Sequence, residues 1–243
     1  MTDERILVTG GRRGIGAALA IGLAGPGRTL LIHHLAAPGE ASRVAERCRL
    51  VGAAVDVLEA DLADPAAVAD LAARAGEVDV LINNAARASN VDIGVLPLAE
   101  WQETFAVNVT APMLLSRAFA PGMADRGRGR IVNITSASVR LGGPSGPSYV
   151  SSKAALIGLT RSLARAFGKD GITVNAISPG AIATEGEREL TRTGLHDETL
   201  ATQAIPGDLV PDDLVGPIRY LVSDGAAAVT GQVIEVGAGL VLR

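Results

Sequence analysis

The chain has 243 residues, of which 48% are hydrophobic and 20% are charged, and a formal net charge of −4. This composition excludes a globally disordered chain and argues against a nucleic-acid partner. A single cysteine excludes an internal disulfide, no apolar stretch is long enough to span a membrane, and the charged start leaves no room for a signal peptide. These features predict a cytoplasmic protein with no membrane partner.

Short apolar strands alternate with alanine-rich helical stretches along the chain. Runs rich in Val, Ile and Leu predict buried strands at residues 5–10, 29–34, 53–61, 78–84, 130–136, 172–178 and 231–237. Stretches of helical length lie at residues 14–23, 41–50, 65–74, 101–125 and 148–167. This alternation is typical of a parallel sheet covered on both faces. We therefore predict one doubly wound α/β domain of the Rossmann type over residues 1–243, with a seven-stranded parallel sheet; an unrelated α/β fold of the same rhythm is the alternative.

The first predicted strand enters a glycine-rich turn, "VTGGRRGIG" at residues 8–16, which opens the first helix. Such spaced glycines permit a tight turn, close approach of the backbone to a pyrophosphate, and close packing of helix on strand. The free N–H groups and the positive end of the helix attract phosphates. The turn therefore predicts a dinucleotide site, with cofactor contacts at Gly10, Arg12, Arg13, Gly14, Ile15 and Gly16.

The end of the second predicted strand, "IHHLAAPGE" at residues 32–40, bears on which dinucleotide binds. NAD-preferring sites commonly place an acid there to hold the ribose 2′-hydroxyl, and here no acid precedes Glu40. Arg12 and Arg13 can pair with a 2′-phosphate, which favours NADP(H) over NAD(H). Simple solvent exposure of both arginines is the alternative.

Two adjacent histidines, His33 and His34, lie in the same strand. Adjacent strand residues point to opposite faces of a sheet, so the pair is a poor metal site. We interpret both as structural or cofactor-lining, take His34 as a candidate cofactor contact, and predict no metal.

Residues 148–153, "SYVSSK", place one of the two tyrosines four positions before one of the two lysines. Residues four apart on a helix share a face, so the phenol of Tyr149 and the ammonium of Lys153 are expected to lie side by side. A neighbouring cation stabilises phenolate and lowers the pKa of a phenol, which is about 10 when free. This pair suits acid–base chemistry on a ketone or alcohol. A surface tyrosine and lysine on a helix is the structural alternative.

Further motifs extend the pattern from end to end. They are "EADL" at 59–62, "NNA" at 83–85, "VNVTAP" at 107–112, "IVNITSAS" at 131–138, "NAISPGAIAT" at 175–184 and "TGQVIEVGAG" at 230–239. Together with the glycine turn and "YVSSK", they make the chain resemble the single-domain short-chain dehydrogenases/reductases. Within that family it is most similar to 3-oxoacyl-acyl-carrier-protein reductases and related carbonyl reductases.

The resemblance implies a role for each matching position. Tyr149 is the acid–base group, Lys153 is its partner, Ser136 donates to the substrate oxygen, and Asn108 holds a relay water. Ser138 is a rival to Ser136, and the spacing of thirteen residues to Tyr149 favours Ser136. The implied cofactor contacts are Asp61 and Leu62 at the adenine, Asn84 and Ala85 at the ribose, and Tyr149 and Lys153 beside the nicotinamide and its ribose. Ile182 and Thr184, after the turn at Pro179 and Gly180, are implied at the carboxamide end of the nicotinamide.

Three positions depart from the family pattern. Ala86 stands where the family has glycine, and Asp170 and Asp208 stand where carrier-protein reductases tend to have basic residues. The two acids add negative charge where an acidic carrier protein would dock, which weakens that substrate assignment. The polar segment at about 185–206 is expected to form a lid over the substrate.

The leading hypothesis is an NADP(H)-dependent oxidoreductase that interconverts a secondary alcohol and a ketone of the 3-oxoacyl or another small carbonyl type. Its partner is then a small-molecule substrate, free or carrier-bound. One alternative is an NAD-dependent polyol, sugar or cyclic-diol dehydrogenase. Another is a regulator that senses NADP(H) without turnover, against which the intact catalytic set argues.

Apolar residues also suggest self-association. Helices 101–125 and 148–167 carry apolar side chains beyond one sheet-facing stripe, and the chain closes on the apolar "VIEVGAGLVLR". Contacts between equivalent helices can bury such surfaces. The resemblance implies the same interface in a homotetramer, with a second contact through the last strand. We therefore predict a tetramer, with a dimer as the second choice; packing within the monomer is the alternative.

Overall fold

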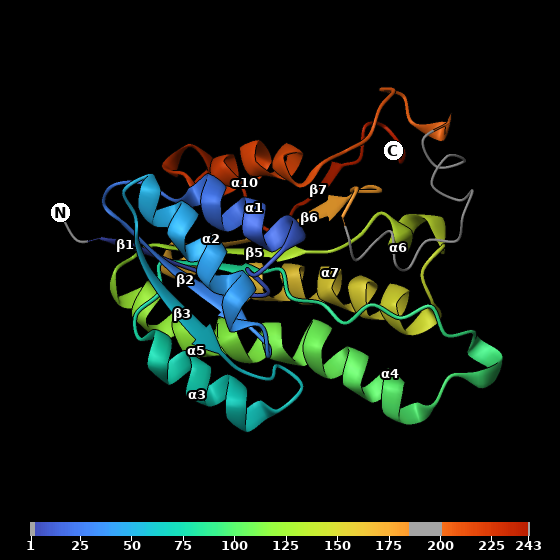
Figure 1. Ribbon diagram of the computed structural model, residues 1–243, viewed down its shortest axis with the longest axis horizontal. Helices are drawn as coiled ribbons and strands as arrows, with labels where there is room; N and C mark the ends of the chain where they lie inside the picture. The colour runs from blue at the N-terminus through green and yellow to red at the C-terminus, as the bar shows by residue number, and fades with distance from the viewer. Residues whose placement is uncertain (1–2, 185–200, 243) are drawn as a thin grey trace.

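The computed structural model describes residues 3–184 and 201–242. Within these residues, parallel strands form one seven-stranded sheet in the order β3–β2–β1–β4–β5–β6–β7 (Figure 1). The strands are β1 (Glu4–Val8), β2 (Arg28–His34), β3 (Ala54–Glu59), β4 (Val80–Asn83), β5 (Gly129–Ile134), β6 (Ile172–Pro179) and β7 (Val233–Val236). Each lies inside or within one residue of its predicted run, so the predicted fold class is confirmed. The strand order reverses between β1 and β4, which is where such sheets bind ligands.

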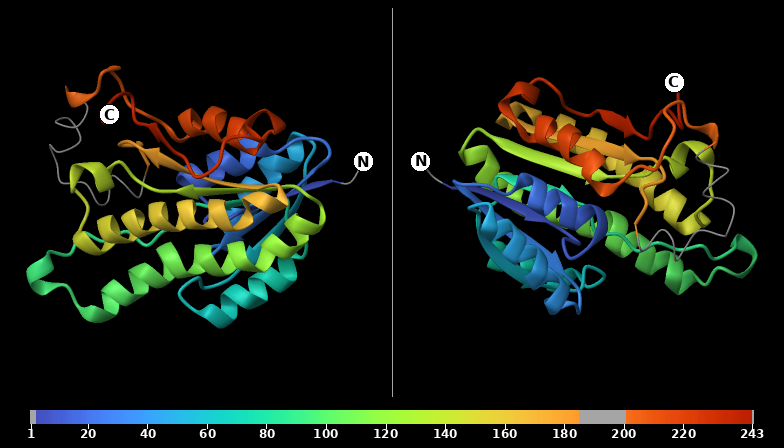
Figure 2. Two further views of the ribbon diagram at one scale, coloured as in Figure 1. Left: turned by 180° about the vertical axis from the view of Figure 1, so that it is seen from behind. Right: turned by 45° about the horizontal axis from the view of Figure 1, so that its top comes forward.

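Helices cover both faces of this sheet, as Figures 1 and 2 show. One layer holds α1 (Gly14–Leu23), α2 (Pro38–Leu50) and α10 (Val215–Val222). The other holds α3 (Pro65–Ala75), α4 (Leu98–Phe105), α5 (Ala111–Asp125) and α7 (Pro147–Phe167). Short helical turns lie between the longer elements along the chain: η1 (Ile93–Val95), η2 (Ala106–Thr110), α6 (Ser138–Leu141), η3 (Gly168–Asp170), η4 (Pro211–Leu214) and η5 (Asp224–Ala226).

The central strands are buried on both faces because their side chains alternate between two cores. In β1, Ile6 and Val8 pack in the core beneath α1 and α10, whereas Leu7 packs in the core beneath α3 and α5. All three side chains are fully buried. This arrangement explains why the strands have near-continuous apolar sequences.

Two helices differ from their predicted bounds. α2 begins at Pro38, three residues earlier than expected, because proline suits the first turn of a helix. The helix predicted over 101–125 begins at Leu98 and is divided by the π-helical turn η2, which contains Asn108. Such turns are frequent at functional sites, and the alternation of apolar residues did not reveal this one.

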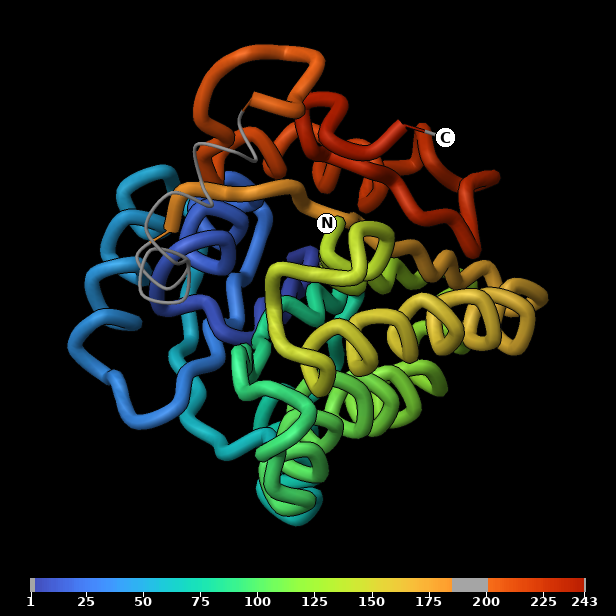
Figure 3. Tube along the Cα trace, turned by 90° about the vertical axis from the view of Figure 1, so that its right-hand side faces the viewer, coloured from blue at the N-terminus to red at the C-terminus, as the bar shows by residue number. Residues whose placement is uncertain are grey.

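The segments that carry the sequence motifs lie at the carboxyl ends of the strands. Figure 3 views this end of the molecule, where the chain after β1, β4, β5 and β6 comes together. Most of the predicted lid, residues 185–200, lies outside the described residues. In the described part of the chain, no helix combines the length and the apolar composition needed to cross a bilayer.

Candidate active site

The glycine-rich turn between β1 and α1 has the shape that the sequence predicts. Gly10 has φ +65°, and a Cβ added there would lie 2.9 Å from the Ala85 backbone. A Cβ at Gly16 would lie 2.2 Å from the Gly10 carbonyl oxygen, so only glycine lets α1 start this close to the turn. The turn leaves the Arg13 side chain exposed at the mouth of a large cavity.

The "NNA" segment, at the end of β4 and just beyond it, hydrogen-bonds to the start of this turn. The Asn84 side-chain amide donates to the carbonyl oxygens of Thr9 (2.9 Å) and Gly10 (3.3 Å). The backbone N–H groups of Asn84 and Ala85 both donate to the Thr9 hydroxyl. Ala86 does not have a positive φ, so a residue with a side chain fits where the family has glycine.

Ser136 follows β5 and is coupled to Ser138. The Ser136 oxygen accepts hydrogen bonds from the Ser138 hydroxyl (2.8 Å) and the Ser138 backbone N–H (3.2 Å). Two incoming donors leave the Ser136 hydroxyl to direct its own hydrogen elsewhere. The two serines are therefore partners in one arrangement, although the sequence presented them as rivals.

Tyr149 and Lys153 lie on the first turns of α7, which begins at Pro147 after the turn at 142–146. The Lys153 side chain is 2% exposed, and its Nζ lies 5.6 Å from the centroid of the Tyr149 ring. Nζ donates to the Ile134 carbonyl oxygen at the end of β5 (2.7 Å). Burial lowers the pKa of the Lys153 ammonium from 10.5 to about 8. The predicted side-by-side placement of phenol and ammonium is thus present.

Asn108 occupies the π-helical turn, and its side chain is fully engaged. Its amide donates to the Arg87 carbonyl (3.0 Å) and the Ser152 hydroxyl (2.9 Å), and its oxygen accepts from the Arg87 N–H (2.8 Å). Four residues on is Pro112, which has no N–H to give to the Asn108 carbonyl in the α-helical pattern. The Asn108 side chain thus joins the π-helical turn to the Arg87 backbone and to Ser152, and its part in holding a relay water stays a prediction.

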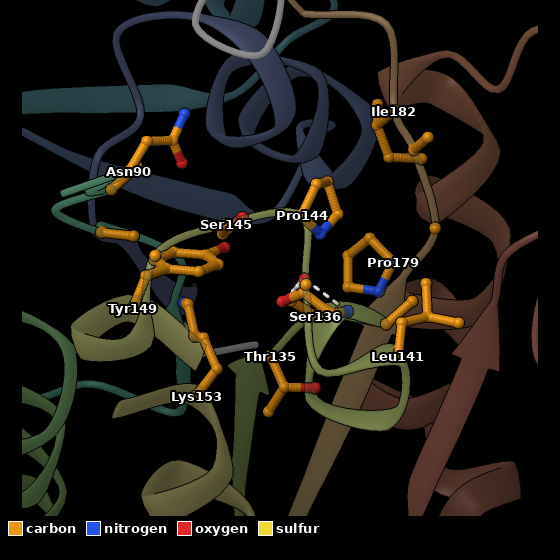
Figure 4. A pocket seen from close by; sticks show the side chains of 18 of the residues that line it. Asn90, Thr135, Ser136, Leu141, Pro144, Ser145, Tyr149, Lys153, Pro179 and Ile182 are labelled. Atoms are coloured by element: carbon orange, nitrogen blue, oxygen red, sulfur yellow. Dashed lines mark hydrogen bonds between the residues drawn. The ribbon is translucent and has the colours of Figure 1, made fainter. Parts of the chain in front are cut away.

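A cavity of about 1020 Å³ collects most of the predicted catalytic and nicotinamide-side residues. Figure 4 shows Tyr149 and Lys153 on one side of it and Ser136 opposite, with Pro179 and Ile182 beyond. The predicted residues that line it are Arg13, Ile15, Asn84, Ser136, Tyr149, Lys153, Pro179, Gly180, Ile182 and Thr184. Those that do not are Gly10, Arg12, Gly14, Gly16, His34, Asp61, Leu62, Ala85 and Asn108.

The residues predicted at the adenine end lie beside the ends of β2 and β3. The Asp61 carboxylate is exposed and accepts from the Ala63 N–H (2.9 Å). Leu62 and His34 are 6% and 3% exposed, and His34 Nδ1 accepts from the Ala37 N–H (3.3 Å). The contact of Asp61 and Leu62 with an adenine, and that of His34 with the cofactor, stay predictions.

Glu40 is a residue whose part in this region the sequence did not reveal. From the first turn of α2 its carboxylate reaches back to Arg12, with Nη1 and Oε2 2.6 Å apart. Arg13 is exposed and faces the cavity instead. Arg12 is therefore paired with an acid, whereas Arg13 lines the cavity. The acid comes from the first turn of α2 and not from the end of β2, where NAD-preferring sites commonly place one.

The outer part of the cavity has lining that sequence reasoning missed. Polar side chains come from Asn90, Asp92 and Ser145, and apolar ones from Ile93, Leu141 and Leu240. Their only sequence signal was position, because they follow the "NNA" motif, the Ser136 motif or, for Leu240, the last motif of the chain, in short segments without a pattern of their own. Among the described residues, no cluster of three or more His, Cys, Asp or Glu side chains could hold a metal ion.

The site joins a dinucleotide-type glycine turn to a Ser, Tyr and Lys set at the carboxyl ends of parallel strands. This combination defines a Rossmann-fold oxidoreductase that acts on CH–OH or C=O groups. A family model described as enoyl-(acyl carrier protein) reductase matches residues 10–241. The chain belongs to the short-chain dehydrogenase/reductase family.

Three similar proteins show the range of that family around this chain. A probable galactose dehydrogenase of Rhizobium meliloti (strain 1021) is 38% identical and is aligned over 99% of this chain and 96% of its own. D-xylose 1-dehydrogenase of Caulobacter vibrioides (strain NA1000 / CB15N) is 33% identical, with 98% and 96% covered. The crystal structure of 3-oxoacyl (acyl-carrier-protein) reductase from Agrobacterium tumefaciens C58, with NADP bound, has a TM-score of 0.89, 30% identity and 97% and 93% coverage.

Proposed function

We propose that this protein is an NADP(H)-dependent oxidoreductase that interconverts a secondary alcohol and a carbonyl in a small polyhydroxylated substrate. The observation that carries the proposal is that Ser136, Tyr149 and Lys153 line one cavity with Arg13 and Thr184. The residues fit a dinucleotide, because Gly10 and Gly16 have no space for a Cβ in the tight turn and at the close start of α1, and Gly14 between them, at φ +54°, leaves the backbone free of a side chain where a pyrophosphate approaches.

When bound, the nicotinamide ring supplies or accepts the hydride. In the reductive direction Tyr149 gives its phenolic proton to the substrate oxygen, and in the oxidative direction the phenolate takes it back. Ser136 donates a hydrogen bond to the same oxygen and stabilises the negative charge that grows there. Lys153 stabilises the phenolate, and its remaining donors suit the ribose hydroxyls.

The preference for NADP(H) rests on Arg13, with Arg12 as a second cation held by Glu40. A planar guanidinium pairs well with a phosphate, and the exposed Arg13 is in the glycine turn, near the start of α1. The NADP-bound reductase of A. tumefaciens supports the same choice. If the enzyme used NAD(H) as well as NADP(H), Arg13 would not be recognising the 2′-phosphate.

The preference for a polyhydroxylated substrate rests on the polar outer lining. Asn90, Asp92 and Ser145 offer both donors and acceptors to hydroxyl groups. Two of the similar proteins are named as sugar dehydrogenases. Asp170 and Asp208 also disfavour an acidic carrier protein. A 3-oxoacyl thioester is the second candidate, because Ile93, Leu141 and Leu240 give the same cavity an apolar side.

Steady-state turnover tests this proposal directly. The purified protein is assayed with NADP⁺ and NAD⁺ on a panel of aldoses, sugar acids and polyols, and with NADPH on a 3-oxoacyl thioester. We expect the highest kcat/KM for a sugar-type alcohol with NADP⁺. A higher kcat/KM for the thioester would select the second candidate, and tight NADPH binding without turnover of any compound would instead indicate a sensing regulator.

A further inference from the structure

The imidazole ring of His33 lies between two segments that flank the dinucleotide site. His33 is near the end of β2 and is 2% exposed. Its Nδ1 lies 3.0 Å from the Gly10 backbone nitrogen, in the glycine turn that follows β1. Its Nε2 lies 3.0 Å from the Ala60 carbonyl oxygen, in the segment that follows β3. One side chain thus joins the ends of three adjacent strands.

These two contacts define the protonation state of the ring. A backbone N–H can only donate and a carbonyl oxygen can only accept. Nδ1 must therefore present its lone pair to Gly10, while Nε2 carries the hydrogen that points to Ala60. Only the neutral imidazole with its hydrogen on Nε2 satisfies both, because a protonated ring would turn an N–H toward the Gly10 N–H.

His33 holds the first two amides of the glycine turn. The Gly11 N–H donates to the His33 backbone carbonyl (2.9 Å), so the first two glycines of the turn both bind this one residue. Gly10 sits at φ +65° against the Ala85 backbone, which leaves the turn little freedom to move as a whole. Without Nδ1, the Gly10 N–H would lose its partner in a partly buried place, at a cost in free energy.

We propose that His33 is a positioning residue of the dinucleotide site, which holds the glycine turn and the segment before Asp61 in register through its neutral Nε2–H form. The inference rests on the proposed function, since it gives His33 a part in binding the same cofactor. His33 need not touch the cofactor. It sets where the phosphate-side turn lies relative to the predicted adenine-side residues.

Burial keeps the imidazole ring of His33 neutral. The charged or titratable groups that act on it are His34 on β2, Arg74 on α3 and Asp61 after β3. Burial is the largest effect and lowers the pKa of His33 from 6.5 to about 4. Because the folded-state pKa is lower, the unfolded chain binds the proton between about pH 6.5 and 4. Stability is lost as the pH falls through that window, and at pH 7 the turn keeps its anchor.

Three substitutions separate the two hydrogen bonds. His33→Leu removes both, and His33→Asn keeps an acceptor on Cγ where Nδ1 stood. His33→Gln keeps a donor at the position of Nε2. Leu31→Val is the matched control, because Leu31 is equally buried in β2 but lies in the core. For each protein the dissociation constant for NADPH is measured by titration calorimetry, and backbone hydrogen exchange is followed in peptides from the turn and from β5.

We expect His33→Leu to raise the NADPH dissociation constant by about tenfold and to speed exchange in the turn more than in β5. His33→Asn should recover most of both effects, whereas His33→Gln should not recover the protection of the turn. Leu31→Val should lower stability without changing the dissociation constant. Equal NADPH affinity in His33→Leu and wild type, with equal exchange in the turn, would overturn the proposal.

Imidazole ¹⁵N spectra of the unsubstituted protein test the same bond without any variant. At pH 7 the His33 resonances should show hydrogen on Nε2 and a bare Nδ1, with no titration near pH 6.5. A ring protonated at Nδ1 would overturn the proposal. If the wild-type chain bound no dinucleotide, the proposed function would fail, whereas the spectra and the exchange at Gly10 would still report whether His33 anchors the turn.

Discussion

The ammonium group of Lys153 is buried, and keeping it charged lowers the stability of the folded protein. Its pKa of about 8, against 10.5 in water, corresponds to about 3 kcal/mol of destabilisation when the ammonium is charged. The folded-state pKa is lower than the unfolded one, so the unfolded chain holds the proton more tightly between about pH 8 and 10.5. Stability therefore rises with pH across that window, and the full cost is present below it.

Lys153→Met is therefore expected to raise the stability of the cofactor-free protein while it removes activity. The lost hydrogen bond to the Ile134 carbonyl offsets about 1–2 kcal/mol, which leaves a net gain of about 1–2 kcal/mol at pH 7. Urea unfolding at pH 7 and pH 10 measures this, and the gain should shrink at the higher pH. A variant less stable than wild type at pH 7 would show that the charge is not costly.

The ion pair between Arg12 and Glu40 joins the glycine turn to α2. Arg12 and Glu40 are 28% and 39% exposed in their side chains, so their ion pair is worth about 0.2–1 kcal/mol. Glu40→Gln releases Arg12 and is expected to lower the dissociation constant for NADPH by about two- to fivefold, with little change for NADH. In an Arg12→Ala background the same substitution should have no effect. Equal changes for both cofactors would mean that Arg12 does not read the 2′-phosphate.

The arrangement of strands could be predicted from sequence because each buried strand has its own apolar run between turns. The proposed catalytic residues could be named because Tyr149 and Lys153 are four apart on one helix, and Ser136 follows from the family resemblance. The π-helical turn, the Arg12–Glu40 pair and the ring of His33 could not be predicted. The ion pair and the ring of His33 depend on contacts between segments that are distant in sequence, and the turn is a local change of backbone hydrogen bonding within an apolar helix. Neither periodicity nor spacing records such features.

Two surfaces of the molecule, along β7 and on α7, are suited to contacts between copies of the chain. β7 is an edge strand whose four residues are all half-buried, and the Leu242 side chain is 79% exposed. On α7, Gly158 is exposed, and a Cβ there would meet nothing within 4 Å among residues 3–184 and 201–242. A free edge strand and an open helix face are features that contacts between copies can cover. The homotetramer stays a prediction.

Gly158 offers a test of that assembly, because a larger side chain there has room in the monomer. The wild-type protein is expected to have about four times the chain mass of 24.7 kDa by light scattering at micromolar concentration. Gly158→Trp should reduce that mass to a dimer or monomer and leave the secondary structure by circular dichroism unchanged. A wild-type mass equal to one chain would refute the tetramer.

The central claim is that Tyr149 transfers the proton that accompanies hydride transfer. The most direct measurement is the turnover of Tyr149→Phe beside its NADPH affinity, because this change removes one oxygen and little else. We expect kcat to fall by about 10²–10⁴-fold, while the dissociation constant for NADPH stays within about twofold of wild type. A variant that kept more than about a tenth of the wild-type kcat would contradict the claim, since another group would then be moving the proton.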